Sequence, residues 1–294
     1  MVKRLVSLCA VGAIVGVIGG GMLLSGQQIP EPRKQFGASV TGAFEGWFAN
    51  QDGSRSFLVG YFNRNTQQEL DIPIGPNNRI EPGGPDLGQP THFLPGRQFG
   101  MFVVPVPKEF TQQDKYTWTI VANGLSATIP LRLNNDYVVS PFVEIAVGNT
   151  PPVIRFEQNG SPIQGPIATV AQAAIRTASL SAPLPLTVWA ADDMKYTNNT
   201  SAPMSKPRPP VTLTWSKYRG PGTVTFDKAK LDVEPSPSPG SSALPFNGKA
   251  TTNAKFSEPG EYVLHVTAND YSGDGGGGFQ CCWTTALVKV SVKP

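Results

Sequence analysis

The chain has 294 residues, including 31 glycines and 29 prolines, and a formal net charge of +3 at pH 7. This glycine and proline content disfavours a helical protein and favours short strands joined by turns. The small net charge excludes the strongly basic surface typical of proteins that bind nucleic acid or anionic membranes. The length allows two domains of ordinary size, each with its own core.

Residues 1–26 have the pattern of a secretory signal. Lys3 and Arg4 precede an apolar run from Leu5 to Leu24, which is the order of charged and apolar segments in signal peptides. The run is also long enough to span a bilayer, and no A-x-A cleavage site follows it. Two interpretations stand: a cleaved signal peptide, which we prefer, and an uncleaved anchor through residues 5–24. Both predict an exported protein, in the periplasm, at the cell surface or outside the cell.

Residues 36–148 predict a first β-sandwich of roughly seven strands. Alternating, aromatic and β-branched runs are broken by turn residues, and no amphipathic helix is found. Gln51-Asp52-Gly53 and Asn123-Gly124 are hairpin turn signals between two pairs of these runs. The predicted strands include residues 43–50, 54–65, 99–106, 116–122, 125–133 and 137–147.

A proline-rich segment, residues 73–96, interrupts these strands. It is too rich in proline for a core strand and too long for an ordinary loop. We prefer an extended, ordered crossing over the sandwich surface. The alternative is a functional loop, in which His92 would be the ligand or base.

Four segments of the second half share a recognisable pattern: PLPLTVWAADD (183–193), PPVTLTWSKYRGPGTVTF (209–226), ATTNAKFSEPGEYVLHVTAND (250–270) and ALVKVSV (286–292). Together they resemble the polycystic-kidney-disease (PKD) repeat and related immunoglobulin-like modules of secreted bacterial proteins. The resemblance covers residues 149–294, about half of the chain. It implies a second sandwich of seven strands, with a role in spacing or adhesion and without catalysis.

The spacing of apolar residues agrees with such a sandwich. Val211, Leu213 and Trp215 share one strand face, because side chains alternate along a strand. Tyr262 follows Pro259-Gly260, which is the tyrosine-corner position of these sandwiches, and Trp215 takes the place of their buried tryptophan. Leu186 or Val188 and Leu264 stand where antibody domains carry the bridging cysteines. The fold class predicted for the chain is thus all-β, with two tandem immunoglobulin-like sandwiches after the signal segment.

The stretch GDGGGGFQCCWTTA, residues 273–286, lies between the last two predicted strands. A phosphate loop would need a helix start and a following lysine, which are absent, so a hairpin turn is predicted. The chain enters this sandwich at Asn149, at the same end, so the first domain should sit over this turn. Outside the signal segment, Cys281 and Cys282 are the only cysteines. In an oxidising compartment they could form an adjacent-residue disulfide, which we prefer, stay free, or bridge two chains.

No catalytic residue is predicted. Nucleophilic catalysis needs a base within reach, and the chain has only His92 and His265. The strand register predicts that His265 faces solvent. Metalloprotease, nucleophile-elbow and EF-hand patterns are absent from the sequence.

Acidic residues cluster in two loops that share one end of an immunoglobulin-like sandwich. Calcium takes six to eight oxygen ligands, which carboxylate-rich loops supply. The alternative is that these are ordinary turn residues. The candidate ligands are Asp192, Asp193, Asn269, Asp270 and Asp274.

Trp189 and Trp283 are predicted to point outward near the same end. Exposed tryptophans stack on sugars or contact proteins. The sequence therefore predicts an exported, non-catalytic binding or structural module that mediates protein interaction or adhesion, with a protein or glycan partner at the cell surface. The alternatives are a carbohydrate-binding module and a hydrolase that uses the segment 73–96.

Overall fold

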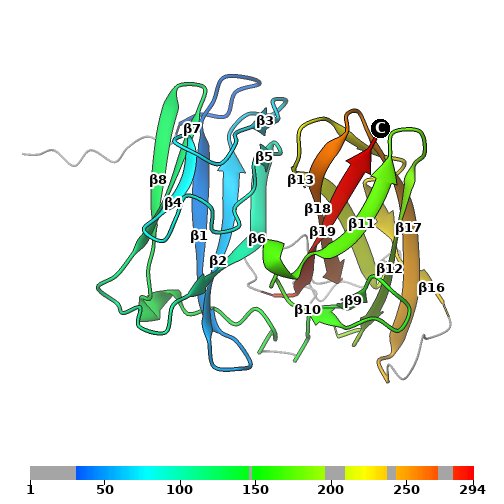
Figure 1. Cartoon of the computed structure of the whole chain (residues 1–294). Coiled ribbons are helices and arrows are strands. Elements are labelled where there is room, and N and C mark those ends of the chain that lie inside the picture. Colours follow the sequence, from blue (N-terminus) through cyan, green and yellow to red (C-terminus); the bar gives the residue numbers. More distant parts are fainter. Residues whose placement is uncertain (1–30, 146–147, 196–208, 237–242, 271–280) are drawn as a thin grey trace, which may run out of the picture. The chain divides into compact units, whose positions relative to one another are not determined.

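Short apolar runs separated by turn residues form strands along the whole described chain. The computed structural model describes residues 31–145, 148–195, 209–236, 243–270 and 281–294 (Figure 1). Within these ranges the regular elements are β-strands and two single-turn 3-10 helices. The prediction of an all-β protein is confirmed. None of the helices in the described part is long and apolar enough to cross a membrane.

The N-terminal sandwich, residues 40–131, packs a sheet of order β1-β2-β6 against a sheet of order β4-β7-β8, and a separate pair β3-β5 lies beside them. The ring of Phe102 meets that of Trp118 edge to face at 5.4 Å between the two sheets. The strands are β1 (Val40–Ala49), β2 (Arg55–Asn63), β3 (Leu70–Asp71), β4 (Asn78–Glu81), β5 (His92–Phe93), β6 (Gly96–Val106), β7 (Tyr116–Ala122) and β8 (Leu125–Leu131).

Both predicted hairpins are confirmed. β1 pairs with β2 across the turn that contains Gly53. β7 pairs with β8, and the turn residues Asn123 and Gly124 have φ of 51° and 76°. Asparagine and glycine tolerate this left-handed conformation better than other residues do, which explains the turn at this position.

The predicted strand at 137–147 is wrong. A 3-10 turn, η1 (Asn135–Tyr137), replaces its start, and the Asn134 side chain caps this turn by accepting from the Asp136 amide. Val138 then makes only an isolated bridge with Trp47. Asparagine and aspartate favour such caps over strands, and Pro141 has no amide hydrogen to give to a sheet.

The segment 73–96 is an ordered crossing, which is the interpretation preferred from the sequence. β4 within it pairs with β7. The buried Asn78 side chain holds the segment in place, because it accepts from Trp118 Nε1 at 3.0 Å and donates to the Ile72 and Pro90 carbonyls at 2.9 and 2.8 Å. Its later residues, 86–91, contact the second half of the chain.

The C-terminal sandwich, residues 153–293, packs a sheet of order β10-β9-β12-β17-β14, with β16 also on β17, against a sheet of order β11-β19-β18-β13-β15. β11 runs parallel to β19. The elements are β9 (Val153–Arg155), β10 (Ile163–Gln164), η2 (Val170–Gln172), β11 (Ala174–Ser179), β12 (Leu184–Asp192), β13 (Val211–Arg219), β14 (Val224–Phe226), β15 (Lys230–Asp232), β16 (Glu234–Pro235), β17 (Phe246–Phe256), β18 (Gly260–Asp270) and β19 (Trp283–Lys293).

The inner core of this sandwich has the predicted residues. Trp215 and Tyr262 are buried, and Leu186, Val188 and Leu264 belong to the same core. Tyr262 Oη donates to the Glu258 carbonyl at 2.9 Å and accepts from the Gly222 amide at 3.1 Å. The predicted tyrosine corner is therefore confirmed, while the immunoglobulin-like class of each sandwich stays a prediction.

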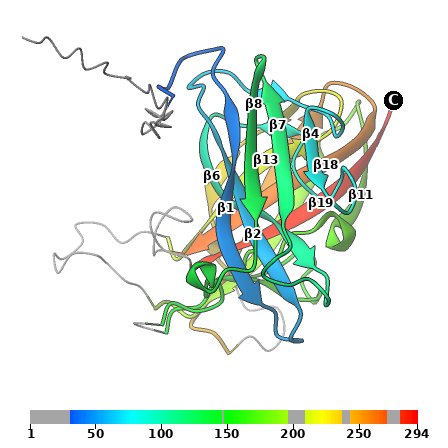
Figure 2. The ribbon, with the colours of Figure 1, turned by 90° about the vertical axis from the view of Figure 1, so that its left-hand side faces the viewer.

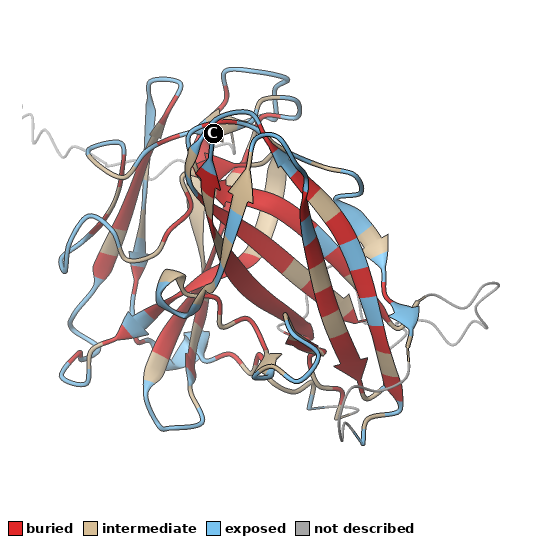
Figure 3. Ribbon diagram, turned by 45° about the vertical axis from the view of Figure 1, so that its right-hand side comes forward, coloured by how far each residue is buried: buried red, intermediate tan, exposed pale blue. Residues whose placement is uncertain are grey.

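The other face of the sheet β13-β18-β19 is also buried. Val263 and Leu287 on this face belong to the core of the N-terminal sandwich. Figure 2 shows β1, β7 and β8 in front of β13, β18 and β19, and in Figure 3 buried residues run along the inner strands without the alternation of an exposed sheet. Residues Glu31–Pro294 pack as one unit, and the domain boundaries at 36–148 and 149–294 stay a prediction.

We call this contact surface the joint: β6 and residues 86–91 against β13, β18 and β19. Two residues of β13 bind the segment 86–91 through hydrogen bonds. The Tyr218 hydroxyl donates to the Gly88 carbonyl, and the Arg219 guanidinium donates to both Asp86 carboxylate oxygens at 2.9 and 2.8 Å. The joint thus combines apolar burial with a two-point ion pair, the geometry in which arginine holds a carboxylate best.

The joint corrects two predictions of exposure. His265 and Trp283 were expected to face solvent, and each is 1 % exposed. The strand register was correct, but the outward face of the sheet carries the N-terminal sandwich in place of water.

Truncation of Trp215 tests the inner core. We expect Trp215→Ala to lower the free energy of unfolding by about 3 to 5 kcal/mol, the loss typical of a buried large aromatic. Thr214→Ala, at an exposed position of the same strand, should change it by less than about 0.5 kcal/mol. Urea denaturation measures both, and similar losses in the two variants would contradict the register.

Substitution of Gly100 tests the joint. Gly100 has φ of +49°, and a Cβ there would lie 2.6 Å from Trp283 Cζ2. We expect Gly100→Ala to lower the free energy of unfolding by about 1 to 3 kcal/mol through overpacking, in addition to backbone strain. Gly53→Ala is the matched control for strain, because Gly53 has φ of +82° and open space around it. Equal losses in denaturation of the two variants would mean that the contact between Gly100 and Trp283 is not tight.

Candidate functional sites

His92 lies in an ion-pair cluster beside the joint. Its Nδ1 is 3.0 Å from Asp71 Oδ1, and its Nε2 is 3.3 Å from Glu69 Oε2. Asp71 Oδ1 is also 2.9 Å from Nζ of Lys217, a buried lysine on β13. Burial by itself would raise the pKa of Asp71, but the hydrogen bonds from His92 and Lys217 outweigh burial and lower it. The cluster therefore carries an ionised carboxylate between two nitrogen donors from different halves of the chain.

His265 lies inside the joint. Its ring stacks on that of Tyr218, with the ring centroids 5.9 Å apart and the planes 16° apart. Burial lowers the pKa of His265 to about 4, against a smaller opposite effect of a hydrogen bond with the Met101 backbone. The imidazole is therefore neutral at neutral pH and serves as a packing residue.

The two candidate tryptophans do not share an exposed surface. Trp283 packs against Phe48, Leu58, Val103 and Val139 within the joint. Trp189 is half-buried on β12, with Arg155 and Lys249 as its cross-strand neighbours. The sugar-stacking surface predicted from these two residues is therefore not formed.

The acidic candidates at the end of β12 and β18 come together. Asn149 Nδ2 donates to Asp270 Oδ2 at 2.7 Å. Asp193 Oδ2 accepts from the Thr150 amide and hydroxyl at 3.1 and 2.8 Å. Burial raises the pKa of Asp192 to about 7, and the Asp270 and Asp193 charges add to the rise, against the hydrogen bond from the Met194 amide.

The remaining candidate ligands differ in placement. Asn269 lies in β18 opposite Trp283 and Thr212, and Asp274 lies outside the described residues. Among the residues that the structure describes, no group of three or more His, Cys, Asp or Glu side chains is arranged to hold a metal ion. The sequence interpretation missed Asn149, although NTPPV directly precedes the first strand of this half. The burial of Asp192 and Asp270, which makes a polar neighbour necessary, is visible only in the structure.

Cys281 and Cys282 are joined in a disulfide, the first of the three alternatives. Both are buried. Cys282 Sγ lies 3.4 Å from the Asn149 carbonyl oxygen, a contact and not a hydrogen bond, because a disulfide sulfur carries no hydrogen. The whole of the preceding glycine run, residues 273–278, lies outside the described residues.

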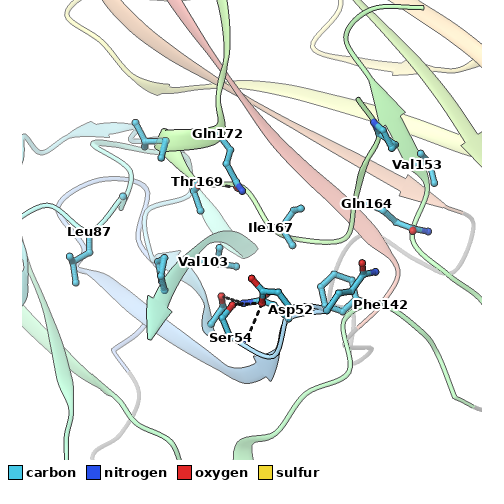
Figure 4. Close-up of a pocket in the computed structure, with 18 of the residues that line it drawn as sticks. Asp52, Ser54, Leu87, Val103, Phe142, Val153, Gln164, Ile167, Thr169 and Gln172 are labelled. Carbon is cyan, nitrogen blue, oxygen red and sulfur yellow. Dashed lines mark hydrogen bonds between the residues drawn. The ribbon is translucent and has the colours of Figure 1, made fainter. Parts of the chain in front are cut away.

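A groove of about 1150 Å³ lies between the two sandwiches (Figure 4). Apolar atoms make up most of its lining, and polar side chains stand among them. The N-terminal wall includes Asn50, Gln51, Asp52, Ser54, Leu87 and Val103, and the C-terminal wall includes Val153, Arg155, Gln164, Ile167, Thr169 and Gln172.

The charges of the groove lie on opposite walls. Asp52 accepts from the Ser54 hydroxyl and amide at 2.6 and 2.9 Å, and these hydrogen bonds lower its pKa. Asp86 is held by Arg219, which lowers its pKa as well. Arg155 stands on the other wall. A ligand would therefore meet a mostly apolar surface, with acidic side chains on one wall and a basic side chain on the other.

No family model and no curated protein matches the chain. Among solved structures it is similar to the D0-D1 domain of intimin (10% identity, TM-score 0.24, 86% of this chain and 98% of that chain). It is also similar to domains 4 and 5 of the S-layer protein SbsC (12%, TM-score 0.21, 87% and 98%). A third similar structure is a protein of unknown function from Porphyromonas gingivalis (8%, TM-score 0.22, 86% and 100%). These TM-scores are too low to establish a shared fold.

Replacement of His265 tests its buried, neutral state. The folded pKa of about 4 lies below the ordinary value of 6.5, so the unfolded chain binds the proton first and stability falls as pH drops through this window. Relative to His265→Phe, which keeps a stacked ring, the wild-type free energy of unfolding should fall by about 1.4 kcal/mol for each pH unit as the pH drops from 6.5 towards 4.

Urea denaturation of both proteins between pH 4.5 and 7.5 measures this difference. The comparison with the variant is needed because Asp192, with a raised pKa, contributes the opposite slope in the same window. Parallel pH profiles would show that His265 is accessible to protons in the folded state.

Proposed function

We propose that the chain is an exported, non-catalytic binding module that holds an extended segment of a protein partner in the groove between its sandwiches. The observation that carries this proposal is the groove itself, about 1150 Å³ in volume and lined from both halves of the chain. This volume is slightly above the range of small-molecule pockets. The proposal includes the signal segment 1–26, the domains 36–148 and 149–294, and the immunoglobulin-like, PKD-type class of the second domain.

The lining favours a polypeptide partner. Four side-chain amides line the groove, and three of them are partly used within the protein: Asn50 Nδ2 donates to the Ser54 and Ser56 hydroxyls, Gln164 Nε2 donates to the Pro151 carbonyl, and Gln172 Oε1 accepts from the Thr169 hydroxyl. The remaining groups of these amides, together with the Gln51 amide, can pair with the alternating groups of an extended backbone. Apolar residues such as Ile167 and Val153 can take side chains of the same segment. Recognition through an extended backbone with side-chain pockets is a common mode of peptide binding.

A glycan partner is supported less well. Sugars bind on open aromatic faces, and Phe142 is the aromatic residue of this groove. Its ring meets Phe48 edge to face at 5.4 Å, and the Gly165 backbone lies against it, since a Cβ there would be 2.5 Å from the ring. Phe142 thus packs within the protein and does not offer a free stacking surface.

The proposal of a non-catalytic module also draws on His92. Both nitrogens of its ring lie beside carboxylates, Asp71 and Glu69. A general base must have one nitrogen free to face the nucleophile or substrate. The hydrolase alternative would need a rearrangement of this cluster.

A library of random dodecapeptides displayed on phage, selected on the purified chain, tests the proposal. We expect peptides whose affinity falls at least about tenfold, or about 1.4 kcal/mol, in Ala171→Trp, because Ala171 is an exposed residue of the groove wall. Ala182→Trp, an exposed alanine outside the groove, is the matched control. Equal affinities of both variants would place binding elsewhere. Selection of no peptide, together with binding on a glycan array that Ala171→Trp abolishes, would establish the carbohydrate-binding alternative.

A further inference from the structure

We propose that Asp192, Asn149 and Asp270 form a calcium site where the chain passes from the N-terminal to the C-terminal sandwich. The three side chains come from different segments: Asp192 ends β12, Asp270 ends β18, and Asn149 lies in the connection before β9. This inference does not depend on the groove or on its partner.

The first observation is a buried carboxylate oxygen of Asp192 without a partner. Asp192 is 1 % exposed. Its Oδ1 accepts from the Met194 amide at 2.8 Å, whereas its Oδ2 has no hydrogen-bond partner. A buried acceptor left in this state costs about 1 to 3 kcal/mol, and more when it is charged.

The second observation is independent of the acids. Asn149 is fully buried, and its Oδ1 also has no hydrogen-bond partner. The other end of the same amide, Nδ2, is fixed by Asp270 Oδ2 at 2.7 Å. The Asn149 amide is therefore held against Asp270, one of the acids, while its oxygen stays buried without a partner.

The local charge favours a cation. Asp193 Oδ2 accepts from the Thr150 amide at 3.1 Å, and Asp270 Oδ2 accepts from the neighbouring Asn149 side chain at 2.7 Å, so both acids meet the same short connection. Lys195 is one nearby cationic group, and its Nζ donates to the Gly148 carbonyl at 3.1 Å. Burying like charges side by side is unfavourable unless a proton or a metal ion compensates them.

The donor set favours calcium over a transition metal. The available donors are carboxylate and amide oxygens, which suit hard cations. The neighbouring sulfurs of Cys281 and Cys282 are bonded to each other, so they offer no thiolate for zinc. An ion here would tie the connection at Asn149 to the ends of two strands and so restrain the chain beside the joint.

Calcium titration of the chelator-treated chain at pH 7.5 tests the site by calorimetry and by the melting temperature. We expect binding with a Kd of about 10⁻⁴ to 10⁻³ M, the range of extracellular modules, and a melting temperature that rises with calcium. Asp192→Asn and Asn149→Ala should each weaken binding at least about tenfold. Asp232→Asn, an exposed acid of the same sandwich, should bind as the wild type does.

Several results would overturn the proposal. Absence of calcium binding by the wild type would do so directly, whether or not the variants fold. Equal calcium affinity in Asp192→Asn would place the ion elsewhere. A melting temperature that ignores calcium but is raised by Asp192→Asn, most strongly at pH 8, would show that a proton shared by the carboxylates takes the place of the ion.

Discussion

The sheet formed by β13, β18 and β19 is buried on both faces, and the rest of the structure depends on this burial. One face belongs to the core of the C-terminal sandwich, with Trp215 and Leu264. The other face gives Val263 and Leu287 to the core of the N-terminal sandwich. Each apolar side chain removed from water contributes roughly 1.5 to 3 kcal/mol, so separating the sandwiches would expose a surface that water does not stabilise. The two halves therefore behave as one folded unit and not as two independent domains joined by a linker.

The polar groups of the joint set its geometry. Apolar contact has no direction of its own, whereas the paired hydrogen bonds from Arg219 to Asp86 fix the position of residues 86–91 against β13. Those residues form part of the groove wall. The proposed binding surface is thus shaped by the joint, and the proposed calcium site lies on the connection that leads into it. A module of this kind presents one rigid surface from two sandwiches, which reduces the entropy lost on binding a partner.

Strand alternation predicted the inner core but not the second burial. Trp215, Tyr262 and the Asn123-Gly124 turn follow from local patterns, because side-chain period and backbone conformation depend on neighbours in sequence. The burial of His265 and Trp283 depends on what covers the outward face, and alternation does not report this. A signal was present in the consecutive apolar residues 262–264 and 286–288, since strands buried on both faces read as continuous apolar runs. Asn149 was missed because a single polar residue before a strand has no periodicity to mark it.

The central claim, that the joint couples the two sandwiches into one folding unit, is tested most directly by differential scanning calorimetry of the purified chain. The account predicts a single transition whose calorimetric enthalpy equals its van't Hoff enthalpy, as for a cooperative unit. Two separate transitions, or a van't Hoff enthalpy near half of the calorimetric one, would show that the sandwiches unfold independently and would contradict the account.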